Sequence, residues 1–554
     1  MDKVRVFALG GLDEDGKNMY AVEINNEILL IEAGIKYPES TKLGIEKITP
    51  DFTYIIENKD RVKGIFITHA HNDVVGALPY LLKQVDLEVY ATPLNANIIQ
   101  GNLIQNDIKS ARIKKVKRGS KVKIGNITVE TFATTHSVGE SIGLAIKTSQ
   151  GYVVYTGEFI VDFDAHDPAF TCDISKIAEI GNQNVLCLLT ESIGASRKGH
   201  TAPQHRIRDI IDPYFENAKG RIIISTYAQT VYRAMEILNL AIRYNRKIAI
   251  IGNELKYMLD KVVSMGYFTI PNGLLVDLRK IDVNDPNLVI VISGSGANVF
   301  RKIHRIALNE DELIQVTDRD TIIIASQIVP GTEKDAANME NELYKSGAKI
   351  ITISSKQLYS MHASSEDLKM MIYLLKPKYY IPVHGEYRQL IDNANVATSM
   401  GITPDRIVVL DNGQVADFED GVLKTTANTV PVGEVMIDGS SELDSSGVVI
   451  KDREQLSTDG VIVVGVMIDF KTKAVIGGPD VQMRGFVYLK DADHIVTTIM
   501  GICEDTIKSC VASNHYENMA CRVEIRDRIA KYVLKETGKR PMVLPAIVEI
   551  NLAA

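Results

Sequence analysis

Short runs in which hydrophobic and polar residues alternate dominate the first 160 residues, and this pattern is typical of half-buried strands. The expected strands are residues 3–9, 18–25 and 27–34, and a second cluster of strands is expected within residues 121–137 and 142–159. Asn25-Asn26 and Ser149-Gln150-Gly151 fall where tight turns would join neighbouring strands. Helical patterns lie between the strands. The sequence therefore predicts a mixed α/β sandwich.

The pattern of apolar and polar residues changes at about Arg221, where apolar strands begin to alternate with amphipathic helices. The expected elements are strands 221–227, 247–252, 287–294 and 321–326 and helices 228–245 and 253–267. Alternation of this kind predicts a parallel sheet with helices on both faces. We expect an inserted domain over residues 207–348, which interrupts a first domain made of residues 1–206 and 349–431.

A third region follows a stretch rich in Gly, Ser and Asp at residues 432–449, which is typical of a linker. Beyond it, residues 450–554 form a unit large enough to fold alone. We expect strands at 460–469 and 484–490 and helices from about residues 497 and 516. The overall prediction is an α/β fold with a small α+β C-terminal domain.

Composition limits the class of protein. An apolar content of 45%, a charged content of 24% and a net charge of −8 are those of a globular protein. No apolar run approaches the roughly 20 residues that span a bilayer, and residues 1–11 lack a cleavable signal layout. Five cysteines without CxxC spacing favour a reducing cytoplasm and argue against a thiolate zinc site. The dense basic run at 109–125 is more simply a solvated hairpin flank than a dedicated RNA groove.

Candidate chemistry is concentrated in the stretch "FITHAHNDVV". His69, His71 and Asp73 lie between an apolar strand at 64–68 and a helix expected at 74–83. Two imidazoles at positions i and i+2 can turn towards one ion, while the carboxylate reaches a neighbouring ion. This mixture of ligands suits zinc or manganese.

Three further residues follow expected strands in the same way. They are His136 in "FATTHS", Glu158 in "VYTGEF" and His384 in "IPVHGE". With the loop residues they make six candidate metal ligands, and we expect them to converge at one end of the sandwich.

The motifs "THAHND", "TTHS", "YTGEF", "HASSE" and "PVHGEYR", in this order, resemble those of the metallo-β-lactamase fold with a β-CASP insertion. Over most of the chain the sequence resembles bacterial ribonuclease J. The resemblance implies a metallo-β-lactamase αββα sandwich, a β-CASP domain that covers RNA and a C-terminal oligomerisation domain. It also implies a two-metal hydrolase that degrades RNA from a 5′-monophosphate end and can cut internally.

Several positions depart from the family pattern. Val74 replaces the last histidine of HxHxDH, Glu158 replaces the bridging aspartate, and Glu32 and Glu191 replace two further aspartates. The segment implied to contact substrate is His362, Ala363, Ser364, Ser365 and Glu366. Glu366 stands where the resemblance places the histidine that meets the scissile phosphate. Asp73 and Glu366 are thus the candidate catalytic positions.

These departures predict reduced activity. The second metal site loses an imidazole at position 74, a longer bridge alters the ion separation, and a carboxylate at position 366 repels phosphate. They are similar to the changes in the active-site-degenerate paralogue of bacteria that carry two. We expect a weak nuclease with one ion rather than two, binding RNA and forming a homodimer or a hetero-oligomer with an active paralogue, away from membranes.

Two other interpretations stay open on the sequence. One is a fully competent manganese-dependent 5′–3′ exoribonuclease, and the other is a non-catalytic scaffold that binds RNA. The turn "SGSGAN" at 293–298 is equally consistent with a phosphate cradle and with an ordinary strand-to-helix turn.

Overall fold

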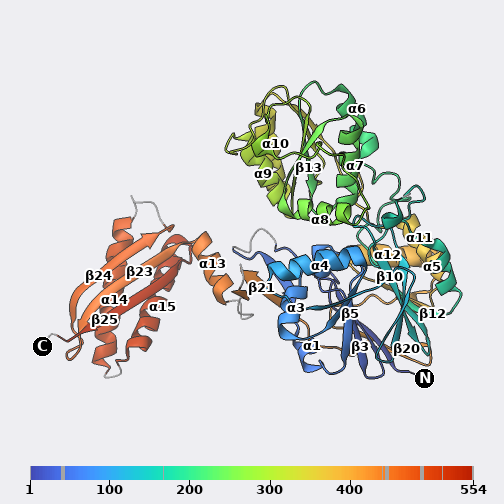
Figure 1. Cartoon of the computed structure of the whole chain (residues 1–554). Coiled ribbons are helices and arrows are strands. Elements are labelled where there is room, and N and C mark those ends of the chain that lie inside the picture. The colour runs from blue at the N-terminus through green and yellow to red at the C-terminus, as the bar shows by residue number, and fades with distance from the viewer. Residues whose placement is uncertain are drawn as a thin grey trace. The chain divides into compact units, whose positions relative to one another are not determined.

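The computed structural model describes residues 2–38, 44–165, 167–438, 441–442, 448–486, 492–513 and 516–551. The chain divides into two compact units (Figure 1). The first consists of residues 1–37 and 47–435, and the second of residues 38–46 and 436–554. No helix in these described ranges is long and apolar enough to cross a membrane.

Two sheets packed face to face form the body of the first unit, which confirms the predicted sandwich. The eight-stranded sheet consists, in spatial order, of β20 (Val422–Thr425), β19 (Val415–Glu419), β1 (Val4–Gly10), β2 (Met19–Ile24), β3 (Glu27–Ile31), β5 (Val62–Phe66), β6 (Glu88–Ala91) and β7 (Arg112–Lys115). The six-stranded sheet consists of β18 (Tyr379–Pro382), β12 (Val185–Thr190), β11 (Gly151–Tyr155), β10 (Ile142–Thr148), β9 (Ile127–Ala133) and β8 (Lys121–Ile124).

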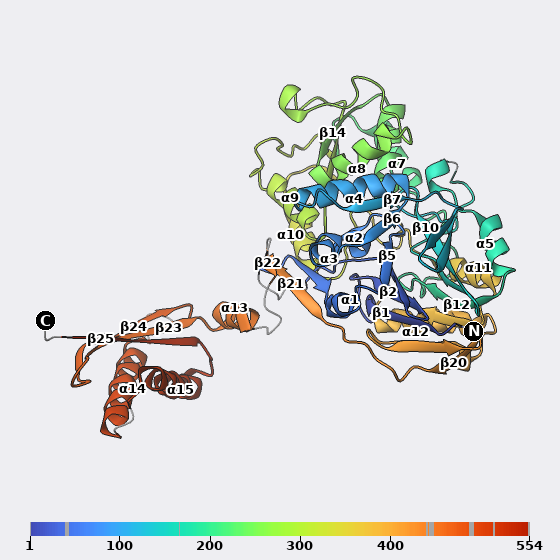
Figure 2. The same ribbon diagram turned by 60° about the horizontal axis from the view of Figure 1, so that its bottom comes forward.

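Alternation along each strand explains the layers. In β1, Val6 and Ala8 enter the core between the sheets, whereas the ring of Phe7 packs 5.4 Å from that of Tyr54 in α1. Helices cover the outer faces (Figure 2). They are α1 (Thr53–Glu57), α3 (Leu78–Gln84), α4 (Pro93–Gln105), α5 (Ile174–Gly181), α11 (Ser365–Leu375) and α12 (Tyr387–Ser399). Because the helices lie on these faces, the last residues of β5, β9, β11, β12 and β18 lead into loops at the strand ends.

The helix predicted over residues 74–83 is in fact two short helices. The first, α2, covers Asn72–Val75, and α3 follows from Leu78. Between them the Ala77 amide donates to the Ala33 carbonyl (2.8 Å) instead of continuing the helix. Pro79 has no amide to donate, so it favours a new helix start at this point. The break leaves α2 as a separate turn that carries Asp73.

The inserted domain is a five-stranded sheet in which all neighbours are parallel, as predicted. Its strands are, in spatial order, β14 (Lys247–Ile251), β15 (Leu288–Gly294), β13 (Ile222–Tyr227), β16 (Thr321–Ile324) and β17 (Lys349–Thr352). β17 pairs with β16 and lies beyond the boundary expected at residue 348, so the inserted sheet extends further than predicted. Its helices are α6 (Arg208–Asn217), α7 (Val231–Arg243), α8 (Asn253–Ser264), α9 (Asn298–Ala307) and α10 (Glu333–Lys345). Within β15, Val289 and Val291 join one core, whereas Ile290 and Ile292 join the core on the opposite face. Burial on both faces explains the unbroken apolar run.

The second unit is an α+β domain, as predicted. It contains α13 (Val448–Thr458), β23 (Val461–Asp469), β24 (Val475–Arg484), α14 (Ala492–Ala512), α15 (Asn518–Thr537) and β25 (Met542–Ile550). The sheet has the order β24-β23-β25, and Ile462 and Val464 pack with Ile525 of α15.

One strand of this unit is placed differently from the prediction. The strand expected at 484–490 lies earlier, at 475–484, where Gly477, Gly478 and Pro479 hide the alternating pattern. Residues 487–490 lie outside the described residues.

The segment predicted as a linker, 432–449, begins with ordered structure. It contains β21 (Glu434–Asp438), which pairs antiparallel with β22 (Ser441–Glu442). A further short strand, β4, covers Lys47–Pro50. Glu434 makes ion pairs with Lys17 (3.0 Å) and Lys36 (2.7 Å). Residues 439–440 and 443–447 of the segment lie outside the described residues.

Candidate metal centre

Strand ends bring the predicted ligands together, although they come from distant parts of the sequence. His69 and His71 follow β5, and His136 follows β9. Glu158 follows β11, and His384 follows β18. The six-stranded sheet and the eight-stranded sheet thus both contribute candidate ligands, and these lie at one end of the sandwich.

Three imidazoles surround one oxygen of Glu158. Glu158 Oε2 lies 3.5 Å from His69 Nε2, 3.7 Å from His71 Nδ1 and 3.0 Å from His136 Nε2. The four ligand atoms all lie within 4.8 Å of one another, which is close enough for one metal ion. This is the first cluster.

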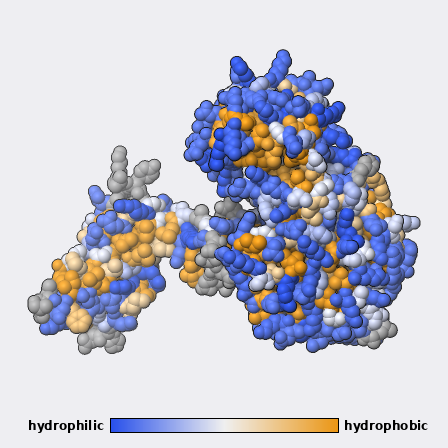
Figure 3. Space-filling model, viewed as in Figure 1, coloured by the Kyte–Doolittle hydropathy of each residue, from blue (hydrophilic) through white to orange (hydrophobic). Residues whose placement is uncertain are grey.

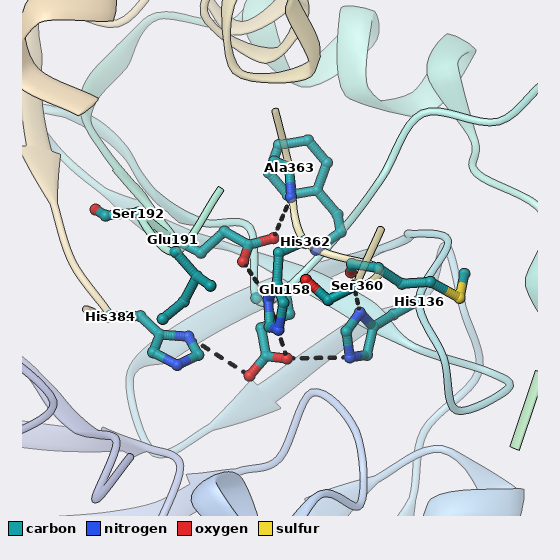
Figure 4. Close-up of polar contacts among 12 residues, drawn as sticks. His136, Glu158, Glu191, Ser192, Ser360, His362, Ala363 and His384 are labelled. Carbon is teal, nitrogen blue, oxygen red and sulfur yellow. Dashed lines mark hydrogen bonds and ion pairs between the residues drawn. The ribbon is translucent and has the colours of Figure 1, made fainter. Parts of the chain in front are cut away.

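The other oxygen of Glu158 faces a second cluster. Glu158 Oε1 lies 3.5 Å from His384 Nδ1, and His384 Nε2 lies 3.6 Å from Asp73 Oδ2. Asn18 Nδ2 donates to the same Asp73 oxygen (3.1 Å). Figure 4 shows the Glu158 carboxylate between His136 on one side and His384 on the other. The longer side chain of Glu158 therefore reaches both clusters, as a bridging carboxylate would.

Position 74 contributes no ligand to the second cluster. The Val74 side chain is 1% exposed, and the Val74 carbonyl accepts a hydrogen bond from Ala33 (2.7 Å). The residue serves packing alone. The second cluster therefore has three ligand groups, Asp73, Glu158 and His384, against four in the first.

The residues present fit divalent cations. His69 Nε2, His384 Nδ1 and both oxygens of Glu158 are buried, with no hydrogen-bond partner among the described residues. Buried polar atoms left in this state are costly, and a shared ion satisfies all of them. The donor set of imidazole and carboxylate, without thiolate, is one that zinc and manganese accept.

The protonation of the ligands agrees with this fit. Burial lowers the pKa of His69 to about 3, despite the opposing effect of Glu158. Burial alone would raise the pKa of Glu158, but the imidazoles of His69, His136 and His384 hold it well below its usual range. A neutral imidazole, as at His69, and an ionised carboxylate, as at Glu158, are the forms that bind metal.

The pKa of Asp73 is shifted in the opposite direction to that of Glu158. Burial in the cleft and repulsion by Glu158 raise the pKa of the Asp73 carboxyl well above its usual range. A cation between the two carboxylates would remove this repulsion, so the second cluster is unfavourable without an ion.

Neighbouring groups fix the orientation of each imidazole in the first cluster. His136 Nδ1 lies 2.8 Å from the Met361 carbonyl, and His71 Nε2 lies 2.9 Å from Ser137 Oγ. His69 Nδ1 lies 2.9 Å from Thr68 Oγ1. Such outer contacts set the tautomer and the ring orientation of a ligand.

Glu32 supports this arrangement from one step further away. Glu32 Oε1 accepts a hydrogen bond from Thr68 Oγ1 (2.6 Å), and Oε2 accepts one from the Thr68 amide (3.2 Å). Burial raises the pKa of Glu32 well above its usual range. Glu32 thus acts on His69 through Thr68 and does not touch either cluster directly.

In the segment predicted to contact substrate, His362 is the residue that faces the clusters. His362 Nδ1 lies 2.6 Å from Glu191 Oε2 and 3.7 Å from Glu158 Oε2 (Figure 4). Burial lowers the pKa of His362, but the Glu191 and Glu158 carboxylates outweigh it and raise the pKa to about 9. An imidazolium is therefore held beside the two clusters.

The rest of that segment anchors α11. The Ala363 amide donates to Glu191 Oε1 (3.0 Å), and Ser364 forms a capping box with Asp367. Ser365 and Glu366 open the first turn of the helix.

Glu366 is not brought to the site. Its carboxylate pairs with Lys369 on the same helix (2.8 Å), and its side chain is 42% exposed. The helix start at Ser365 explains this, because it turns position 366 along the helix surface. Of the residues expected to contact substrate, His362 thus lies 3.7 Å from Glu158, whereas Glu366 pairs within its own helix.

Glu191 is the functional residue whose role the sequence did not reveal. It follows β12 and accepts hydrogen bonds from His362 and from the amides of Ala363 and Phe159 (2.8 Å). The signal was present, since "LLTES" is an apolar strand that ends in a carboxylate in the same manner as the metal ligands.

Four family descriptions match consecutive parts of the chain. Residues 48–166 match the β-lactamase superfamily domain and residues 219–343 the ribonuclease J β-CASP domain. Residues 348–405 match the Zn-dependent metallo-hydrolase RNA specificity domain, and residues 448–550 the ribonuclease J C-terminal domain.

Similar proteins span the whole length. Ribonuclease J 2 of Staphylococcus aureus is 34% identical over 551 residues, covering 99% of this chain and 98% of that protein. Ribonuclease J 2 of Staphylococcus saprophyticus shows the same values. A solved structure of a protein of unknown function from Enterococcus faecalis has a TM-score of 0.52 at 12% identity, covering 75% of this chain and all of that one, a likeness of fold alone.

A sandwich with a histidine-rich loop at its strand ends and an inserted parallel-sheet domain defines a metallo-β-lactamase-fold protein with a β-CASP insertion. Within this class, the 34% sequence identity to ribonuclease J 2 over 551 residues identifies the family. The chain belongs to the ribonuclease J family.

Proposed function

We propose that this protein is a metal-dependent RNA phosphodiesterase, a 5′–3′ exoribonuclease with possible endonuclease activity, that is weak alone and acts with an active paralogue. The observation that carries the proposal is Glu158, a buried carboxylate with one oxygen towards three imidazoles and the other towards His384. Membership of the ribonuclease J family supports RNA as the substrate. The five free cysteines suit a cytoplasmic location.

The residues of the centre would have different roles. His69, His71 and His136 would hold one zinc or manganese ion, and Asp73 with His384 would hold a second, with Glu158 between them. Such ions supply an activated water and neutralise phosphate charge. His362 lies beside both clusters and would donate a hydrogen bond to the scissile phosphate, in the orientation that Glu191 imposes.

Weak activity follows from the second cluster. With three ligand groups and Val74 in place of an imidazole, it would bind its ion less tightly than the first. Mass action can fill a weak site when metal is in excess. Hydrolysis should therefore depend on metal concentration well beyond the point at which the first site is full.

The test measures metal content and hydrolysis on the same preparation. After extensive dialysis, mass spectrometry should find at most one tightly bound equivalent. Cleavage of a 5′-monophosphorylated RNA should then rise with added manganese and vanish in the His69→Ala, His71→Ala double variant. Two equivalents that survive dialysis would contradict the weak second site, and cleavage by the double variant would contradict the assigned centre.

One observation favours a fully competent manganese-dependent exoribonuclease as the second candidate. Both clusters are assembled around Glu158, and His362 is in place with its carboxylate partner. If dialysed protein retains two manganese equivalents and its cleavage is already maximal without further metal, this candidate replaces the first.

A surface of the C-terminal unit supports oligomerisation. One face of its sheet packs on α14 and α15, and the opposite face is apolar and exposed. On that face the parallel register pairs Val463 with Leu544 and Met467 with Val548, and these side chains are 37–53% exposed. Hydrophobic residues are also visible on this unit in Figure 3. We propose that this exposed apolar face, named here the tail face, binds another subunit, either a second copy or an active paralogue.

A further inference from the structure

A run of cations on the first unit has no part in the metal centre. Residues 109–123 contain eight lysines and arginines and no acidic residue, in a chain whose net charge is −8. They are Lys109, Arg112, Lys114, Lys115, Lys117, Arg118, Lys121 and Lys123. We name residues 109–123 the basic crossover, because they connect the two sheets of the sandwich.

The basic crossover closes one open edge of the sandwich. β7 is the end strand of the eight-stranded sheet and β8 the end strand of the six-stranded sheet, and residues 116–120 join them. Val116 is buried and donates its amide to the Ala91 carbonyl (2.9 Å). Thr131 Oγ1 donates to the Lys117 carbonyl (2.8 Å). The backbone is therefore fixed, and the long side chains project from it.

The join lies at the end of the sandwich that carries the metal centre. The parallel register aligns Phe66 with Tyr90 and Tyr90 with Lys114, so Lys114 is level with the end of β5, three residues before His69. Two strand spacings, about 10 Å, separate Lys114 from Phe66 at the end of β5. On the other sheet, Thr131 Oγ1 contacts the Lys117 carbonyl, and β9 ends at Ala133, three residues before His136. Cations of the join are thus close to both halves of the centre.

Part of the positive charge is neutralised within the protein. Arg112 lies 3.2 Å from Asp86, Lys114 lies 3.7 Å from Glu88, and Lys121 lies 2.9 Å from Glu130.

The remaining charge is not neutralised. Among the residues that the structure describes, Lys109, Lys117 and Lys123 have no ion-pair partner, and all three are exposed. Lys115 is exposed and contacts a neutral amide, Asn97 Oδ1 (3.1 Å). Lysines on an edge strand also prevent edge-to-edge aggregation. That role needs cations within β7, whereas Lys109 and Lys117 lie outside any strand.

We propose that the basic crossover binds the phosphodiester backbone of RNA beside the metal centre and so retains long substrates. This inference rests on the proposed function, because it assumes that RNA reaches the centre. Unpaired cations spaced along this segment match the repeating charge of a single strand, and Lys115 and Lys117 lie at the end of the sandwich that carries the metal centre. Short oligonucleotides would occupy the centre without reaching them.

The test compares two triple variants of the full-length protein. The first is Lys115→Gln, Lys117→Gln, Lys123→Gln. The matched control is Lys3→Gln, Lys59→Gln, Lys424→Gln, which removes the same charge from exposed positions elsewhere on the same unit. Affinity for a single-stranded RNA of 30 nucleotides, labelled at its 3′ end, is measured by fluorescence anisotropy over a range of salt concentrations in EDTA, where cleavage does not occur.

In the first variant, we expect the slope of log affinity against log salt to fall by about 2, from three lost contacts at about 0.7 each. The control should keep the slope of the unmodified protein. Hydrolysis of a 4-nucleotide RNA in manganese should be unchanged in both variants. An unchanged slope in the first variant, or an equal fall in the control, overturns the inference. Failure of the unmodified protein to bind RNA at all would instead refute the proposed function.

Discussion

At the scale of single residues, the balance between the two metal clusters depends on position 74. All other candidate ligands are in place, and Glu158 reaches both clusters despite its extra methylene. The longer bridge and the carboxylate at position 366 were expected to weaken the site further. The geometry leaves Val74 as the departure that removes a ligand, whereas Glu366 pairs with Lys369 on its own helix.

Val74→His should therefore restore the second site. An imidazole at this position would give the second cluster a fourth ligand, and dialysed protein should retain two metal equivalents instead of one. Mass spectrometry of the native protein measures the count. Val74 is fully buried, so Val74→Ala serves as the control for altered packing. A folded Val74→His protein that still holds one equivalent would show that position 74 does not limit binding.

His362→Ala should lower kcat roughly 100-fold or more, the scale of a lost hydrogen-bond donor to the charge that develops on the reacting group. Dialysed metal content should stay the same, because His362 belongs to neither ligand cluster. Glu191→Gln, which keeps the shape but loses the charge that orients His362, should lower kcat by about 10- to 100-fold.

The control for position 362 is Glu366→Ala. Its carboxylate is exposed and paired on its own helix, so kcat should not change. If Glu366→Ala impairs cleavage and His362→Ala does not, the two positions have been assigned the wrong way round.

At the scale of elements, strong periodicity was predicted well and local breaks were not. The five parallel strands appeared as unbroken apolar runs because both faces are buried. The break between α2 and α3 depends on the tertiary hydrogen bond from Ala77 to Ala33, which no local pattern reveals. β24 contains Gly477, Gly478 and Pro479, so its alternation was missed. The site followed the same rule, since ligands at strand ends were recognised. Glu191 was named as a departure from the family pattern, but its contact with His362, 171 residues away, was not predicted.

Helix α7 carries a titratable group that makes stability depend on pH. Burial raises the pKa of Glu236 to about 7, against the opposing hydrogen bond from the Ile207 amide (3.0 Å). Between pH 4.5 and 7 the unfolded state loses this proton and the folded state keeps it, so stability falls as pH rises through this range. Below about 4.5 the group is neutral in both states and contributes nothing.

Glu236→Gln should therefore raise the melting temperature at pH 8 relative to the unmodified protein and leave it unchanged at pH 4.5. Gln retains an acceptor for the Ile207 amide, so the hydrogen bond is kept. Differential scanning calorimetry at both pH values checks the sign. A gain that is equal at both values would indicate packing rather than titration.

At the scale of the whole molecule, the C-terminal unit contains none of the candidate ligands, and hydrolysis alone does not explain it. Its tail face offers an apolar stripe in which Val463 and Leu544 are neighbours across two strands, as are Met467 and Val548. Exposure of such a stripe is costly for a monomer and favours burial against another subunit. We therefore expect assembly to depend on this unit.

Met467→Lys, Val548→Lys should convert the oligomer to a monomer, because two charges would be buried without partners at the contact. Truncation after Val435, where the first unit ends, should give the same result and leave a folded core that still binds metal at His69, His71 and His136. The matched control is Lys451→Ala, Lys531→Ala, which changes two charged residues of the same unit away from this face. Light scattering measures the mass of each. If the lysine variant and the truncation both keep the oligomer mass, the subunits meet through the first unit; if only the truncation dissociates, they meet through another surface of the tail.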